Sequence, residues 1–229
     1  IIIPANLQMD MQATANKVNY NGLNLTNVKA QLLLNKGTLT LKNTGFTLIN
    51  APVEMSGSYT SLSPVKAIFN YHIKASNFDI HKAYTDIQLF HDMASAAAKV
   101  KGQVSLDYTL KGNLDANMYP VYPTLKGGGT LTLEKVQVSG LKLFSAVSKA
   151  TNRDSINNPN LEGVKINTTI ANNIITIQRT KMRVFGFRPR LEGQVSFDGK
   201  LNLRFRLGLP PLGVFGIPMS ITQRMHLRT

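Results

Sequence analysis

Apolar side chains fall at nearly every second position over much of this chain, with polar residues between them. In the first quarter the apolar set is Val28, Ala30, Leu32, Leu34, Leu39, Leu41, Phe46, Leu48, Val53 and Met55. A period of two is typical of β-strands that bury one face and leave the other in water. The breaks are rich in turn-forming residues, at Asn35-Lys36-Gly37, Asn43-Thr44-Gly45 and Asn50-Ala51-Pro52. This pattern predicts a meander of short antiparallel strands, with Gly37 in the left-handed position of a three-residue hairpin loop.

The pattern returns later in the chain. Residues 25–57 align with residues 161–193 without a gap, and we refer to these segments as the first and second copies. Leu25, Val28, Lys29, Thr40 and Gly57 meet identical residues, and the apolar positions stay in phase. Gly37 meets Asn173, which is the next-best residue for left-handed backbone. The alignment predicts that the same β unit occurs twice.

Two segments show helical rather than strand spacing of their apolar residues, at 79–98 and 141–151. Asn77 or Asp79 can cap the first of them. We therefore expect a mainly β fold of two repeated antiparallel β-meander units, which form a curved sheet or trough with two short amphipathic helices packed on it. The expected boundaries within one region (1–229) are a first β unit at 1–78, a helix at 79–98, and a second β unit at 99–229 that contains the 141–151 helix.

Charge is distributed unevenly along the chain. The net charge is +14, and all nine arginines lie between residues 116 and 229. Such asymmetry favours an anionic partner for the C-terminal half, although a solvated outer face is the simpler interpretation. The candidate patch for an anionic head group or partner consists of Arg183, Arg188, Arg190, Arg204 and Arg206.

Residue types that carry catalysis do not cluster in this sequence. There is no cysteine, the four histidines lack metal-ligand spacing, and the acidic residues are scattered singly. Lys126-Gly127-Gly128-Gly129 is followed by strand-like residues, whereas phosphate binding requires a helix after such glycines. We expect no catalytic residue, metal site or cofactor, and hence no enzyme. Recognised nucleic-acid motifs are also missing, so we expect no specific nucleic-acid partner.

The sequence contains no stretch long enough to span a membrane. Its longest apolar run, residues 207–219, has 13 residues and three prolines. The chain begins IIIPANLQMD without a Met, and we expect more chain before this segment.

Three stretches resemble the C-terminal region of the AsmA family. They are VKGQVSLDYTLKGNL (100–114), TLTLEKVQVSGLKLFSAVSKATN (130–152), and the segment from NLEGVKINTTI to FDGKLNLRFRL (160–207). The Gly216-Ile217-Pro218 segment after the last strand is also similar. The tail departs from the family pattern, because Thr222-Gln223-Arg224-Met225-His226 stands where a Gly-Thr-x-x-x-Pro turn is expected.

This resemblance implies a periplasmic protein of a diderm bacterium, tethered to the inner membrane by a segment outside this sequence. It also implies a part in outer-membrane biogenesis, through relatives that move phospholipid along an apolar sheet face. The corresponding lipid-facing residues are Leu39, Leu41, Phe46, Leu48, Ile175, Ile177, Met182 and Val184. The alternative is a closed β structural module that docks an envelope protein partner without binding lipid. In that case the apolar side of the 79–98 helix fills the apolar face of the sheet, through Ile80, Tyr84, Ile87 and Phe90.

Overall fold

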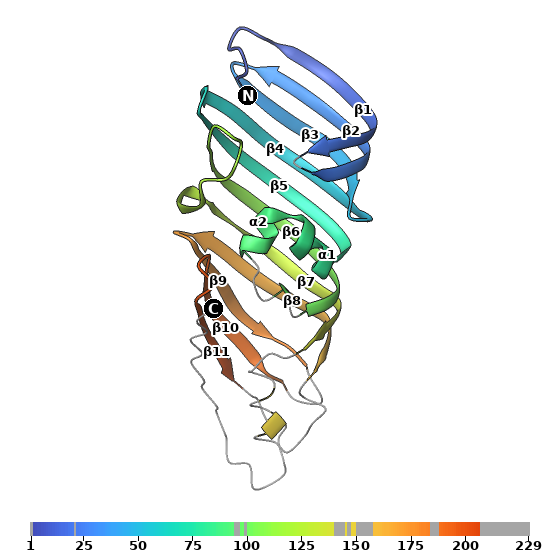
Figure 1. Cartoon of the computed structure of the whole chain (residues 1–229), viewed down its shortest axis with the longest axis vertical. Helices are drawn as coiled ribbons and strands as arrows, with labels where there is room; N and C mark the ends of the chain where they lie inside the picture. Colours follow the sequence, from blue (N-terminus) through green and yellow to red (C-terminus); the bar gives the residue numbers. More distant parts are fainter. Residues whose placement is uncertain are drawn as a thin grey trace. The chain divides into compact units, whose positions relative to one another are not determined.

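A computed structural model describes residues 2–20, 22–93, 97–98, 100–139, 145, 148–149, 158–183 and 188–206. Within these residues, eleven strands form one sheet whose order is the order of the sequence (Figure 1). The strands whose pairing is described all run antiparallel to their neighbours. The mainly β prediction is therefore confirmed. The strands are β1 (Met9–Tyr20), β2 (Leu23–Asn35), β3 (Thr38–Leu48), β4 (Ala51–Ser63), β5 (Lys66–Asp79), β6 (Val100–Leu114), β7 (Lys126–Val138), β8 (Asn160–Ala171), β9 (Ile174–Lys181), β10 (Arg190–Ser196) and β11 (Leu201–Arg206).

The chain divides into two compact bodies. The first body contains residues 1–78, 105–130 and 169–173, and therefore all of β1 to β4. The second body contains residues 79–104, 131–168 and 174–229, and therefore all of β9 to β11. The strands β5, β6, β7 and β8 contribute residues to both bodies, and β5 gives only Asp79 to the second.

The hairpin turns are shorter than the sequence predicts. Lys36-Gly37, Ile49-Asn50 and Asn172-Asn173 each form a two-residue loop in which both residues have positive φ. Gly37 is left-handed, as predicted, with φ of 74°. The predicted three-residue loop is wrong. A two-residue loop forms instead, because positive φ at both of its residues matches the right-handed twist of the flanking strands. Similarly, Ala51 and Pro52 already belong to β4.

The expected turn at Asn43-Thr44-Gly45 is also wrong, because these residues lie inside β3. Leu41 is opposite Gly57 in β4, but Thr44 is opposite Met55, so β3 contains an extra residue at this point. Asn43 takes the left-handed conformation there, with φ of 45°. This β-bulge changes the alternation by one residue, so that Leu41 and Phe46 project from the same face of one continuous strand.

The second copy repeats this bulge. Ile177 is opposite Gly193 and Thr180 is opposite Leu191, which are the equivalents of the Leu41–Gly57 and Thr44–Met55 pairs. Thr44 and Thr180 are both 6% exposed, and each donates its hydroxyl to a backbone carbonyl two residues earlier. The two copies therefore share an irregular pairing as well as an apolar pattern.

The first predicted helix is present as two short helices, α1 (Ile80–Asp86) and α2 (Gln88–Met93). Asp79 caps α1 by accepting a hydrogen bond from the Lys82 amide at 2.9 Å, as expected. The single helix at 79–98 is wrong, because Ile87 has extended backbone and ends α1. A short 3₁₀ turn, η2 (Tyr122–Thr124), precedes β7. The predicted helix at 141–151 lies mostly outside the described residues. Within this range the structure describes Ser145, Ser148 and Lys149, and all three are helical.

Among the described residues, no helix has the length and apolar character needed to cross a bilayer.

Candidate functional site

Two apolar rows cross the first body, because residues directly opposite one another in paired strands share a face. One row is made by residues of five consecutive strands, namely Met9, Leu34, Leu39, Tyr59 and Phe69. The adjacent row on the same face is Met11, Leu32, Leu41, Gly57 and Tyr71. With about 4.8 Å between strands, each row extends over about 19 Å. We call this side of the first body the apolar face, and its other side the polar face.

Solvent exposure falls along these rows from β1 to β5. Met9 is 39% exposed and Met11 is 37% exposed, whereas Tyr59 is 5% exposed and Phe69 is 8% exposed. The leucines of β2 and β3 lie between these extremes, and are half-buried. The part of the apolar face that a ligand can reach is therefore formed by β1, β2 and β3.

Aromatic side chains close the β4–β5 end of the apolar face. The Phe69 and Tyr71 rings stack with their centroids 5.7 Å apart. The Tyr71 ring lies against Gly57, where there is no side chain to displace it. Burial is the main cause that raises the pKa of Tyr71 to about 12, and the charges of the ionised Tyr20 and Tyr59 side chains make smaller contributions to this value.

The predicted lipid-facing residues of the first copy lie together. Leu39, Leu41, Phe46 and Leu48 project from the apolar face, and all four are half-buried. In the second body, Ile175 and Ile177 are half-buried on the corresponding face of β9. Met182 is buried, at 7% exposed, and Val184 lies outside the described residues. Sequence reasoning did not include Met9 and Met11, although their alternation with Asp10 and Gln12 is visible in the sequence.

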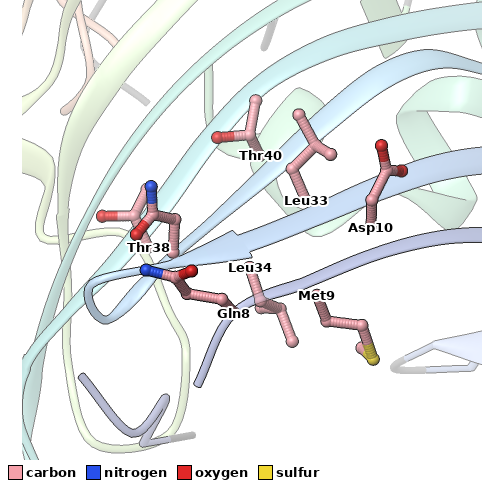
Figure 2. A pocket seen from close by; sticks show the side chains of 8 residues that line it. Gln8, Met9, Asp10, Leu33, Leu34, Thr38 and Thr40 are labelled. Carbon is pink, nitrogen blue, oxygen red and sulfur yellow. The ribbon is translucent and has the colours of Figure 1, made fainter. Parts of the chain in front are cut away.

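A depression of about 600 Å³ lies where β1, β2 and β3 begin or end, and Figure 2 shows its lining. Asp10, Leu33 and Thr40 point to one side of the strands, whereas Gln8, Met9 and Leu34 point to the other. The lining therefore belongs to both faces of the sheet and does not converge on one point. Its one carboxylate, Asp10, accepts a hydrogen bond from the Gln31 side chain at 3.2 Å.

Ionisable groups elsewhere form small surface pairs. His72 Nε2 lies 2.7 Å from the Asp107 carboxylate, and Lys74 Nζ lies 3.7 Å from it, so that hydrogen bonding to His72 lowers the pKa of Asp107. Lys200 is 2.7 Å from Asp198, whose pKa falls to about 2 through hydrogen bonds from Lys200 and Ser196. Over the residues that the structure describes, no three His, Asp or Glu side chains gather in a way that could hold a metal ion.

Basic residues gather in the second body on β9, β10 and β11. Lys181 lies opposite Arg190, and Arg190 lies opposite Arg206, so three cations form a line across three strands. We call these three residues the basic row. All three side chains are exposed. Leu191 and Thr180, which alternate with them, are opposite one another on the other face. The basic row therefore lies on the side of β9 to β11 that faces away from Ile175, Ile177 and Leu191.

The five predicted arginines are placed at this end of the second body. Arg190, Arg204 and Arg206 lie on the paired strands β10 and β11. Arg183 and Arg188 are exposed and lie next to Met182 and Pro189 in the sequence, where the Met182 amide donates to the Pro189 carbonyl at 3.0 Å. Lys181 was not among the predicted residues, although its alternation with Met182 was visible, because its position opposite Arg190 depends on the β9–β10 register.

Glu192 is the acid beside the basic row. Its carboxylate lies 2.7 Å from Arg179 Nε and 3.7 Å from Arg204 Nη1. The hydrogen bond from Arg179 lowers the pKa of Glu192 and raises the pKa of Arg179. Glu192 thus forms ion pairs with two arginines, and the charge of Arg206 also lowers its pKa. In the described pairs of β9 with β10 and of β10 with β11, Lys181, Arg190 and Arg206 are opposite one another and not opposite an acid.

A comparison of the chain with known protein families, with characterised proteins and with solved structures finds no match.

Proposed function

We propose that this chain is a non-catalytic module that shelters the acyl chains of phospholipid on its apolar face. In the setting that the AsmA-like resemblance implies, it assists phospholipid transport between membranes or outer-membrane assembly from the periplasm. The observation that supports the proposal is the pair of apolar rows across β1 to β5, which are partly open to solvent at β1, β2 and β3.

Part of each apolar row is exposed to water, at Met9 and Met11 of β1. Monomeric proteins rarely leave contiguous large apolar side chains in water, and such patches mark surfaces that bind something. Each lipid methylene that leaves water contributes about 0.8 kcal/mol. Binding of this kind needs alternation and length, rather than polar groups at fixed positions. The rows supply both, since Leu32, Leu34, Leu39 and Leu41 are continuous with Met9 and Met11.

Adjacent residues of β3 provide a matched test. Leu41 projects from the apolar face and Thr40 from the polar face, and both are half-buried. We expect native mass spectrometry of the purified protein to detect bound phospholipid, which Leu41→Asp reduces several-fold and Thr40→Asp leaves in place. Circular dichroism shows whether each variant is folded.

The same experiment separates the proposal from a docking role. A folded wild-type protein that repeatedly carries no lipid contradicts the proposal, and favours the closed module that docks an envelope protein. An equal loss of lipid in both folded variants also contradicts it, because the binding then does not depend on the apolar face.

A further inference from the structure

The basic row is an arrangement that the β fold itself does not favour. Directly opposed like charges destabilise a strand pair, whereas opposite charges stabilise it by about 0.2–1 kcal/mol. Lys181, Arg190 and Arg206 place three cations in direct succession across β9, β10 and β11. Close by, Glu192 forms ion pairs with Arg179 and Arg204, and of the three cations only Arg206 contributes to the lowered pKa of Glu192.

The first copy has a row of residues at the positions equivalent to the basic row, and that row is not cationic throughout. Gly45 and Glu54 are the equivalents of Lys181 and Arg190, and they are opposite one another in β3 and β4. Glu54 is in turn opposite Lys74 of β5, and Lys74 lies 3.7 Å from Asp107. On the other side, Gly45 is opposite Lys29 of β2. Two lysines and two acids therefore make the row in the first body charge-balanced, and it supports the same bulged strand pairing. The three cations of the second body are not needed for the fold.

We propose that the basic row docks the second body on an anionic phospholipid bilayer. The row is formed by exposed side chains on one face of a sheet, and a bilayer offers a continuous surface of phosphate groups that such a face can meet. Near an anionic membrane each Lys or Arg contributes about 1 kcal/mol. Single-stranded nucleic acid is the less suitable polyanion, since its binding relies on aromatic side chains among the cations. The described residues on this face of β9, β10 and β11 include none.

The face that carries the row decides which lipid it contacts. Lys181, Arg190 and Arg206 project away from Ile175, Ile177 and Leu191. They cannot bind the head group of a lipid whose chains lie on that apolar side of the same strands. The basic row therefore contacts the surface of a membrane, and this inference does not depend on the sheltering of acyl chains.

The test is sedimentation of the full chain with phosphatidylcholine vesicles that contain or lack phosphatidylglycerol. The variant is the triple substitution Lys181→Gln, Arg190→Gln and Arg206→Gln. The matched control removes the same charge from exposed lysines of the first body, through Lys29→Gln, Lys42→Gln and Lys111→Gln. Wild-type protein should bind the anionic vesicles, less at high salt than at low salt. The triple variant should bind about a hundredfold more weakly, given about 1 kcal/mol for each cation, and the control should resemble the wild type.

Three results overturn the proposal. They are no binding of the folded wild type to anionic vesicles, equal weakening in the triple variant and the control, and binding to duplex DNA without binding to vesicles. Circular dichroism confirms that each variant is folded, and the charge-balanced row of the first copy indicates that the triple variant folds. Lipid that co-purifies with the triple variant reports separately on the apolar face, so either proposal can fail alone.

Discussion

Tyr71 shows how a single side chain in an apolar row becomes sensitive to pH. Its ring lies against Gly57 and stacks on Phe69, and burial disfavours the phenolate. The pKa of Tyr71 is therefore about 12 in the folded protein, compared with 10.0 for the free side chain. The folded state therefore holds the Tyr71 proton more tightly than the unfolded chain does. This difference stabilises the folded protein fully below pH 10, and the stabilisation is lost as the pH rises to about 12.

We expect the melting temperature of the wild type to fall between pH 10 and pH 12 more steeply than that of Tyr71→Phe. The Phe ring keeps the contact with Gly57 but cannot ionise, so the variant lacks this part of the pH dependence. Thermal unfolding monitored by circular dichroism in parallel buffers measures the difference. Identical slopes for the two proteins would show that Tyr71 ionises as readily in the folded state as in the unfolded chain.

The left-handed positions show a second residue-scale regularity. Asn27 and Gly163 are equivalent in the two copies, and both have positive φ, of 53° and 63°. Asn and Gly are the residues that adopt this conformation at low cost. The sequence alignment alone placed an asparagine on a glycine there, and the backbone explains why the two can replace each other.

At the scale of the element, the neighbouring strand explains why a glycine is opposite the start of each bulge, at Gly57 and Gly193. A Cβ on Gly57 would overlap the Asn70 carbonyl oxygen in β5, and a Cβ on Gly193 would overlap the Asn202 carbonyl oxygen in β11. Both glycines also have φ values, 143° and 149°, that other residues rarely adopt. The close approach of the next strand therefore depends on these two glycines.

Gly57→Ala should lower the free energy of unfolding by more than about 2 kcal/mol, because both the overlap and the backbone strain must be relieved. Gly45 is a control in the adjacent strand, since its nearest neighbour would be 3.9 Å from an added Cβ. Gly45→Ala should change stability by less than about 1 kcal/mol. Urea titration of both variants makes the comparison, and equal midpoints would refute the role assigned to Gly57.

The elements that the sequence predicted correctly are those with local causes. Period-two alternation identified the strand meander, and Gly37 and Asp79 were placed correctly because a turn and a helix cap depend on adjacent residues. Asn43-Thr44-Gly45 was misassigned because a bulge and a turn contain the same residue types. Only the partner strand distinguishes them, through the shift from Leu41–Gly57 to Thr44–Met55. The break at Ile87 had no signal in the apolar spacing either.

The candidate sites also divide into features that depend on adjacent residues and features that depend on the partner strand. Apolar residues of β3 were recognised from their alternation, and the arginines from their composition. Neither the succession of Lys181, Arg190 and Arg206 nor the extension of the apolar rows to Met9 and Met11 could be predicted, because both depend on the strand register. The register between strands is a non-local property. The repeat shows which residues of the two copies are equivalent, but it does not show how a copy pairs with strands outside it.

On the scale of the whole molecule, the sheet has a free edge among its described strands. The strand β1 is hydrogen-bonded to β2 alone, whereas β4 lies between β3 and β5. Backbone amides of an edge strand point alternately toward the partner strand and toward solvent. All side chains of β1 other than Ala13 and Ala15 are exposed, but β4 includes the buried residues Ala51, Val53 and Tyr59.

Hydrogen exchange should therefore be graded across the first body. We expect alternate amides of β1 to exchange quickly, and those of β4 to exchange slowest, since its opening disrupts two strand pairs. Residue-resolved exchange followed by NMR tests this expectation. Uniform protection along β1 would mean that its edge is hydrogen-bonded to something else in solution.

The sequential order of the strands also determines how the protein can be made. Each strand that leaves the ribosome has the preceding strand as its partner, and that partner is already synthesised. Among the described strands, each one pairs with the strand that precedes it in the sequence, so the entropy of closing a loop between distant segments does not delay pairing. Until synthesis ends, the growing sheet keeps an unpaired edge that serves as the template for the next strand, and a pause in translation exposes that edge to other nascent chains.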